Sequence, residues 1–340
     1  MPPARPTLLD LAREAGVSSA TVDRVINNRR GVRPRTRAAV LDTARRLGLV
    51  DAHGAEGAPP RPVRLLFLLP AGPNAFIAAL QRQIEAQAAG RPGVAARVES
   101  IEGFNPDSLA RGLDAVGPGI DGIGLVALDH PAVREGIRRL AGRGVRVVTL
   151  ASDVQNVPRL AYVGIDNRQA GRLAGFVMGR FLRPGAAEVA FFAGSRSYRG
   201  HEEREMGFRS VLAEDFGAVR IVAQREIMDD PDRAEAETLA VLDAHPGLHG
   251  IYNAGAGNEG VARALRARGA AGRVALIGHE ATDANKRLLI EGVMDAVIDQ
   301  NPRVEAREAL AALAGAVRGE PHAVVQPRLA IVFRENLPDD

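Results

Sequence analysis

The chain has 340 residues, of which 46% are apolar and 25% are charged, a balance typical of a globular protein with two or three domains. It contains no cysteine and no apolar run of about 18 residues, which excludes disulfides, thiolate catalysis, cysteine zinc sites and a membrane-spanning helix. The net charge is +3, but residues 1–50 hold ten arginines against four acids, while the other 290 residues hold 34 basic and 37 acidic side chains. This asymmetry indicates a polyanionic partner for the first segment alone.

The first fifty residues predict three short helices, and their start lacks the apolar core of a secretory signal, so we expect a cytoplasmic protein. Thr7 and Ser18 are suited to cap the first two helices, and Pro34 is suited to the first turn of the third. The inward-facing positions are predicted to be Leu8, Leu11, Ala12 and Ala15, then Val22, Val25 and Ile26, then Val40, Leu41, Ala44 and Leu47. Two helices joined by a turn at Gly16 and braced by a third form a helix-turn-helix unit.

The second helix of such a unit lies in the DNA major groove with its first residues over the bases. Ser19, Ala20 and Arg24 occupy positions from which they can reach base edges. Polar and basic side chains nearby are suited to phosphate contacts, and these are Thr7, Ser18, Thr21, Asn27, Arg33 and Arg35. The alternatives are that the two last arginines are only solvated, and that the three helices form a bundle without DNA.

The stretch from Thr7 to Leu49 resembles the DNA-binding head of the lactose-repressor family of bacterial regulators. The shared pattern is a Thr-Leu start, Asp-x-Ala, Ala-Gly-Val-Ser, Thr-Val-x-Arg-Val-x-Asn, Thr-Arg and a closing Leu-Gly. The resemblance implies a transcription repressor that binds a palindromic duplex as a homodimer. Two departures are Asp23, where the family usually has Ser, and the linker 51–62, which lacks the family's hinge helix.

From residue 63 the pattern changes to short apolar runs that alternate with amphipathic segments. The runs predicted to be strands are 63–69, 94–101, 122–128, 145–150, 161–165, 188–193, 219–224, 250–254, 273–278 and 295–300. The segments predicted to be helical include 75–89, 131–141, 168–182, 201–213, 232–244, 258–268 and 282–291. This alternation predicts an α/β body with parallel sheets, helices on both faces, and two lobes.

The body, residues 63–334, resembles the periplasmic sugar-binding fold that the same family carries. The resemblance implies an amino-terminal lobe (63–163 and 301–325) and a carboxy-terminal lobe (164–300 and 326–334). It also implies a small-molecule effector, a sugar or polyol, between the lobes. The matching stretches are PNAF, LDHPAV, VTLASD, YVGIDNRQAGRLAG, REMGF, IGHE and IDQNP. The residues expected to bind the effector are Asn74, Phe76, Asp129, Asp153, Arg204, Asn253, Glu280 and Gln300.

Simpler interpretations stay open for three of these residues. Asp129 could cap the helix that begins at Pro131, Phe76 could belong to the core, and Arg204 could be a surface charge. We also keep two other functions open, a solute-binding protein and a nicotinamide-dependent enzyme. The enzyme is suggested by the G-x-G-x-x-G pattern at 255–260, followed by an acid 20 residues later. We expect no cofactor, no metal site and no catalytic residue.

Overall fold

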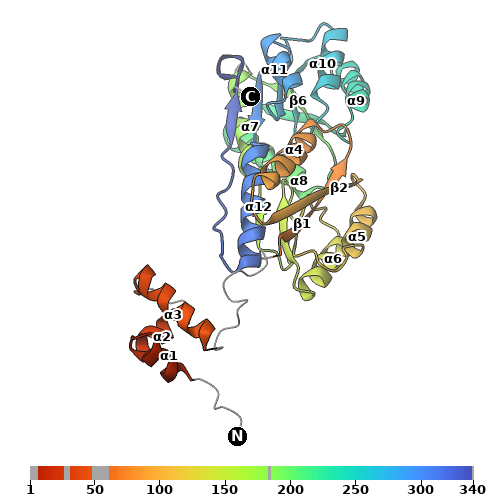
Figure 1. Cartoon of the computed structure of the whole chain (residues 1–340). Helices are drawn as coiled ribbons and strands as arrows, with labels where there is room; N and C mark the ends of the chain where they lie inside the picture. Colours follow the sequence, from red (N-terminus) through yellow and green to blue (C-terminus); the bar gives the residue numbers. More distant parts are fainter. Residues whose placement is uncertain (1–6, 27–30, 48–60, 183–184, 339–340) are drawn as a thin grey trace. The chain divides into compact units, whose positions relative to one another are not determined.

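The computed structural model describes residues 7–26, 31–47, 61–182 and 185–338. The chain divides into two compact units, Met1–Pro62 and Val63–Asp340, called here the head and the body (Figure 1). Among the described residues, no helix combines the length and apolar character that crossing a membrane requires.

The head consists of α1 (Leu8–Glu14), α2 (Ser19–Ile26) and α3 (Pro34–Arg46). Thr7 caps α1 in a reciprocal capping box with Asp10, as its residue type predicts. The three helices share one core, which consists of Leu11, Ala12, Val22, Val25, Val40 and Ala44. Two predicted core residues are wrong, because Leu8 is 52% exposed and Ile26 is 36% exposed. Leu8 begins α1 and Ile26 ends α2, and at these helix ends the side chains lie beyond the small core.

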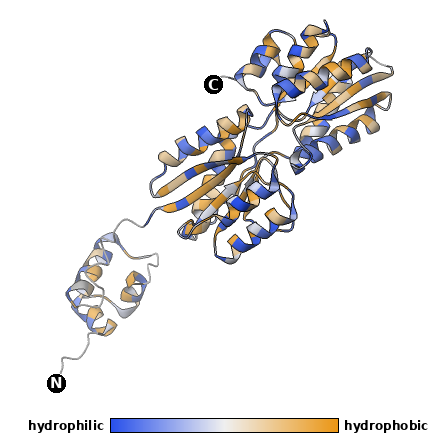
Figure 2. Cartoon of the chain, turned by 90° about the vertical axis from the view of Figure 1, so that its right-hand side faces the viewer, coloured by the Kyte–Doolittle hydropathy of each residue, from blue (hydrophilic) through white to orange (hydrophobic). Residues whose placement is uncertain are grey.

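The first sheet of the body contains five parallel strands in the order β2-β1-β3-β4-β5. The strands are β1 (Val63–Ala71), β2 (Val94–Glu102), β3 (Gly122–Leu125), β4 (Arg146–Leu150) and β5 (Ala161–Val163). One face carries α4 (Ala75–Ala89) and α12 (Pro302–Arg318), and the other carries α5 (Pro106–Asp114) and α6 (Pro131–Gly142). The central strand, β3, is buried at every residue because helices cover both faces of the sheet. Figure 2 shows that the strands of the body are largely hydrophobic.

The second sheet contains six strands in the order β11-β10-β9-β8-β6-β7, and only the edge strand β11 is antiparallel. The strands are β6 (Ala187–Ala193), β7 (Val219–Glu226), β8 (Leu248–Asn253), β9 (Ala275–His279), β10 (Ala296–Asp299) and β11 (Ala330–Val332). Its helices are α7 (Asn167–Phe181), α8 (Arg199–Asp215), α9 (Pro231–Ala244), α10 (Asn258–Ala267) and α11 (Asp283–Ile290). A short 3-10 turn, Arg334–Asn336, follows β11.

Alternate residues of the second sheet face opposite layers. Along β6, Val189 and Phe191 pack with α7 and α8, whereas Ala190 and Phe192 pack with α9, α10 and α11.

All ten strands predicted from the sequence are confirmed by the structure. Three further elements, α5, α12 and β11, were not among the predicted segments.

The two lobes are not continuous in the chain. Helix α12 follows the second sheet in sequence but packs on the first, against α4, β3 and β4. The chain then returns to the second sheet as β11. As a result, residues that follow strands of both sheets lie close together at the carboxyl ends of the parallel strands.

Candidate functional site

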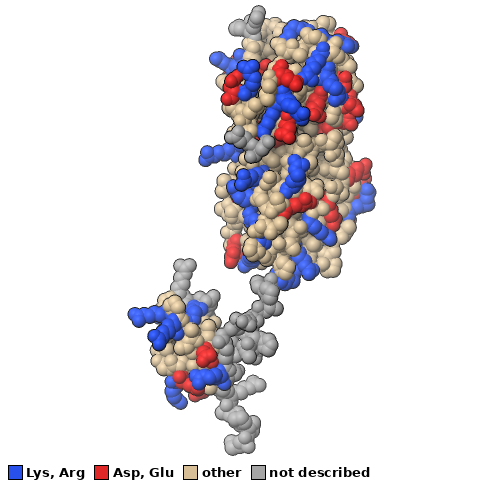
Figure 3. All heavy atoms as spheres, turned by 45° about the horizontal axis from the view of Figure 1, so that its top comes forward, with Lys and Arg blue, Asp and Glu red and all other residues tan. Residues whose placement is uncertain are grey.

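The head presents a polar and basic surface on the described part of α2 and at the start of α3. Ser19, Ala20 and Arg24 are exposed, as are Arg33 and Arg35, and Figure 3 shows basic side chains on the visible face of the head. These five residues remain predicted DNA contacts. Their exposure leaves them accessible to a duplex.

Other predicted phosphate contacts already hold local hydrogen bonds. The Thr7 hydroxyl donates to Asp10 at 2.6 Å, and the hydroxyls of Ser18 and Thr21 lie 2.9 Å apart. Asn27 and linker residues 51–60 lie outside the described residues. Contact of these side chains with phosphate stays a prediction.

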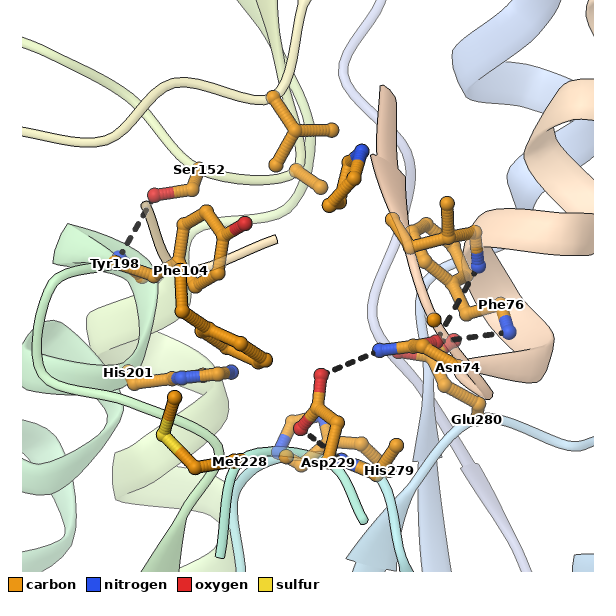
Figure 4. A pocket seen from close by; sticks show the side chains of 18 of the residues that line it. Asn74, Phe76, Phe104, Ser152, Tyr198, His201, Met228, Asp229, His279 and Glu280 are labelled. Atoms are coloured by element: carbon orange, nitrogen blue, oxygen red, sulfur yellow. Dashed lines mark hydrogen bonds between the residues drawn. The ribbon is translucent and has the colours of Figure 1, made fainter. Parts of the chain in front are cut away.

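The body encloses a cavity of about 100 Å³ between its two sheets (Figure 4). One water needs roughly 10–15 Å³ by the same measure, so the space suits a ligand of about ten non-hydrogen atoms. The wall residues follow the carboxyl ends of strands, where open α/β sheets bind ligands. Those used below are Asn74, Phe76, Phe104 and Ser152 from the first lobe, and Tyr198, His201, Arg204, Asp229, His279, Glu280 and Gln300 from the rest of the body.

The cavity wall is held in a strained backbone conformation. Seven described residues other than glycine have φ between 54° and 69°. Five of them line the cavity, namely Phe104, Ala151, Met228, Asp229 and Glu280. Left-handed backbone at such residues costs on the order of 1–3 kcal/mol each and persists where surrounding contacts enforce it, typically at functional sites.

Arg204 forms one wall of the cavity and is only 5% exposed. Its guanidinium donates to Asn167 Oδ1 at 2.8 Å, to the Ala254 carbonyl at 2.7 Å and to Gln300 Oε1 at 3.4 Å. The Gln300 amide in turn donates to Glu280. This buried chain of bonds fixes the side chains that a ligand would meet.

Hydrogen bonds across the cavity join the two lobes. The Asn74 amide, which also caps α4 through its oxygen, donates to Asp229 Oδ2 at 2.8 Å. The Gly200 N–H donates to the Ser152 hydroxyl at 3.4 Å. The second oxygen of Asp229 accepts from the Ala256 N–H at 2.9 Å. That third bond lies within the second lobe, whereas a change in the angle between the lobes must break or replace the first two.

Five of the eight predicted effector residues line this cavity, namely Asn74, Phe76, Arg204, Glu280 and Gln300. Asp129 lies outside it and accepts two bonds from Arg134, while His130 caps α6 in its place. Asp153 also lies outside, paired with Arg159 and with the Thr149 hydroxyl. Asp153 is therefore paired within the first lobe, whereas Asp129 also lies 4.0 Å from Arg199 of α8 in the second lobe.

Asn253 is fully buried behind the wall, where its amide bonds Ala256 and Asn258 and shapes the loop after β8. Conversely, six of the wall residues named above were not predicted, namely Phe104, Ser152, Tyr198, His201, Asp229 and His279. Asp229 had a usable signal, since it lies between the strand-like run at 219–224 and the helix predicted at 232–244.

Burial dominates the electrostatics of the cavity. It raises the pKa of Glu280 to about 8, with the negative charge of Asp299 adding to the effect. It holds the pKa of His279 well below its usual range, and Arg204 and His201 lower it further. The ring of His279 is therefore neutral, with Nε2 2.8 Å from the Tyr252 hydroxyl.

Glu305, in the first turn of α12, is fully buried, and neither of its oxygens has a hydrogen-bond partner among the described residues. Burial and the nearby Glu280 raise its pKa well above the usual value. The folded protein therefore holds this proton at pH values where the unfolded chain releases it, so stability falls as pH rises above about 4.5.

We expect Glu305→Gln, which is neutral at every pH, to weaken this dependence. Urea unfolding should give similar free energies for variant and wild type near pH 4.5 and a variant more stable by about 1 kcal/mol or more near pH 7.5. Exposed Glu259 is the matched control, and Glu259→Gln should keep the wild-type slope. Parallel pH curves for Glu305→Gln and wild type would contradict this assignment.

The glycines of the G-x-G-x-x-G pattern serve packing within the body. A Cβ on Gly255 would lie 2.6 Å from Asp229 Oδ1, and one on Gly260 would lie 1.8 Å from the Pro231 carbonyl oxygen. Gly257 has φ +87° and precedes α10. The pattern thus has a structural cause that needs no dinucleotide.

Comparison with known proteins agrees with the division into head and body. Residues 7–50 match the family described as bacterial regulatory proteins, lacI family, and residues 65–321 match the periplasmic binding protein domain. Catabolite control protein A of Priestia megaterium is 31% identical over 63% of this chain and 63% of its own length. The D-ribose/D-allose-binding protein of Pseudomonas aeruginosa is 27% identical over 54% of this chain. The chain spans 58% of that second relative.

Solved structures share the fold of the body. GanP, a glucose-galactose binding protein from Geobacillus stearothermophilus, superposes with a TM-score of 0.75 at 25% identity, covering 82% of this chain and 99% of GanP. The myo-inositol binding protein of Caulobacter has a TM-score of 0.74 at 22% identity, covering 81% and 94% of the two chains. The second likeness concerns the fold alone.

Proposed function

Because the chain belongs to the periplasmic-binding-protein-domain family and carries a lacI-family regulatory head, we propose that it is a DNA-binding transcription regulator controlled by a small sugar or polyol. The observation that carries this proposal is the presence, in one chain, of a helix-turn-helix head and a cavity walled by two lobes. The regulator acts in the cytoplasm, as a repressor, and its cavity catalyses no reaction.

In this proposal α2 lies in the major groove, where Arg24 donates a pair of hydrogen bonds to a guanine. Arg33 and Arg35, at the start of α3, neutralise phosphates and offset their own repulsion by the positive end of the helix. A homodimer places two heads on a palindromic operator. The relative named HTH-type transcriptional regulator reg1, from Streptomyces lividans, supports a role in transcription regulation.

The effector binds between the lobes and changes their closure, since the cavity walls and the Asn74–Asp229 bond belong to both. A difference in closure between bound and free states shifts DNA affinity by a coupling free energy of about 1–3 kcal/mol. The relative that binds D-ribose and D-allose supports a carbohydrate as effector.

The test is selection of duplexes from a random library at low ionic strength, followed by a thermal-shift panel of pentoses, hexoses and cyclitols. We expect one palindromic sequence to be enriched and at least one polyol to raise the melting temperature and change operator affinity. Failure to enrich any duplex, with and without the polyols, would remove the regulator function.

We expect Arg24→Ala to abolish preference at one position in each operator half-site. Loss of a paired bond to guanine costs about 1–3 kcal/mol of discrimination, or roughly 5- to 150-fold. Fluorescence anisotropy with single-base operator variants measures this. An unchanged ranking of those variants would show that Arg24 does not read a base.

Arg33→Ala is the matched control on the same head. It should weaken binding to all duplexes alike and make the dependence of log affinity on log salt shallower by about one unit. If Arg33→Ala altered base preference instead, the assignment of α2 as the reading helix would be wrong.

A further inference from the structure

The cavity carries two acidic groups, Asp229 and Glu280, that form no ion pair among the described residues. His201 on the same wall is close enough for the Asp229 charge to raise its pKa, although burial lowers that pKa overall. Asp229 faces it from the loop after β7, and Glu280 faces it from the loop after β9 (Figure 4). Among the described residues, no Arg, Lys or His nitrogen lies within 4.0 Å of either carboxylate. Buried carboxylates are normally paired with a cation.

Arg204 is the arginine on the described cavity wall, but its hydrogen bonds go to neutral amide and carbonyl oxygens. It reaches Glu280 only through Gln300. The acid side of the cavity is therefore open to a charge that the ligand supplies.

Glu280 has an oxygen with an unmet hydrogen bond. Its Oε1 accepts from Gln300, whereas its Oε2 is buried and has no partner among the described residues. Its backbone is fixed, because its N–H donates to the Ile298 carbonyl at 3.0 Å and its carbonyl accepts from Asn285 at 2.8 Å. With φ at +69°, this residue is held in a strained position beside the cavity.

The adjacent His279 also has a ring nitrogen without a partner among the described residues. The residue is 1% exposed and lines the cavity, and its Nδ1 has no partner within the described part of the chain. Its other nitrogen is occupied by the Tyr252 hydroxyl. A ligand hydroxyl, which both donates and accepts, satisfies Nδ1 in either tautomer.

Other parts of the wall are apolar and aromatic. Phe104 and Tyr198 meet edge to face with ring centres 5.3 Å apart, and Phe76 is buried beside the same space. Such a surface packs against the C–H face of a saturated ring and attracts a nearby cation.

We propose that the effector is a cationic polyol, an amino sugar or aminocyclitol, whose ammonium group donates to Glu280 Oε2 beside Asp229 while a hydroxyl bonds His279 Nδ1. This inference rests on the proposed function, since it names the class of effector for the same cavity. A neutral polyol would meet the hydrogen bonds but would leave Glu280 protonated and Asp229 without an ion-pair partner.

A proton balance follows from this arrangement. The charged groups around the Glu280 carboxyl are Asp299, Arg204, Asp229 and Glu305, and burial raises the pKa of Glu280 to about 8. The empty protein therefore holds a proton on Glu280 at pH 7. An ammonium group favours the ionised carboxylate, so its binding releases about one proton to solvent, whereas a neutral polyol releases none.

The experiment is isothermal titration of the full-length protein at pH 7, in two buffers of different ionisation enthalpy, with matched ligands. The pairs are glucosamine with glucose, galactosamine with galactose, mannosamine with mannose, and amino-deoxy-inositols with inositols. N-acetylglucosamine retains the nitrogen without its charge. We expect an amine to bind roughly tenfold to hundredfold more tightly than its neutral partner, with release of about one proton.

Glu280→Gln keeps the shape of the side chain and removes its charge, so we expect both the preference for the amine and the proton release to disappear. Asp129→Asn is the matched control, since this carboxylate lies outside the cavity and is paired with Arg134. It should behave as wild type. If Glu280→Gln does not fold, the buffer dependence of the wild type alone still decides.

Tighter binding of the neutral partners, or amine binding without proton release, would overturn the inference and leave the polyol-controlled regulator intact. Absence of binding by every amine overturns it as well. If the neutral partners also fail to bind, the proposal that a sugar or polyol controls this regulator is contradicted as well.

Discussion

Replacing Gly171 with alanine is expected to disrupt the body. A Cβ at this position in α7 would lie 1.9 Å from the Arg204 carbonyl oxygen in α8. The clash is with backbone, so no change of side-chain rotamer relieves it. Because α7 and α8 pack closely along their lengths, we expect a loss of about 3 kcal/mol or more, with a misfolded product at the upper end.

The measurement is thermal and urea unfolding of the Gly171→Ala protein, with Gly142→Ala as control. Gly142 ends α6, and a Cβ there has nothing within 4 Å, so we expect no loss and a gain of up to about 1 kcal/mol. Loss of less than about 1 kcal/mol at Gly171 would contradict the close approach of α7 and α8.

Arg204→Ala is expected to have the second large effect, on both stability and effector binding. It leaves Asn167 Oδ1 and the Ala254 carbonyl without their donor and removes the cation nearest to Glu280 and Glu305. Removing one member of a buried charged network costs about 3–5 kcal/mol. We expect loss of that size in urea unfolding and no measurable effector binding by titration.

Arg209→Ala is the matched control, because Arg209 lies on the same helix but is exposed and pairs only with Glu205 among the contacts resolved for it. An exposed pair contributes about 1 kcal/mol or less. Similar losses for the two variants would show that burial of Arg204 does not give it the stated role.

The spacing of apolar residues along the sequence predicted most of the fold, because strands and helices place their buried residues at different intervals. Strands buried on both faces read as short apolar runs, and the helices between them read as amphipathic segments. Helix α12 was missed because it is alanine-rich and buries Glu305 and Glu308, which hide its apolar face. Strand β11 has only three residues, too few for a recognisable alternation.

The site was predicted where residue type and strand end coincide, as at Asn74, Glu280 and Gln300. Asp129 and Asp153 do not line this cavity, because each is held by a nearby arginine, and their role in effector binding stays a prediction. Each has an arginine five or six residues later that binds it. Phe104 and His201 reach the wall only through the loop after β2 and the first turn of α8, which no local pattern reveals.

The position of α12 in the sequence also affects how the protein folds during its synthesis on the ribosome. The first sheet is complete in sequence at Val163, yet the helix that covers α4 and the strands β3 and β4 ends at Arg318. At roughly 5–20 residues per second, that covering helix emerges on the order of ten seconds later. During this interval an apolar sheet face lies open to chaperones or to other nascent chains, so the first lobe is completed only after most of the second has been synthesised.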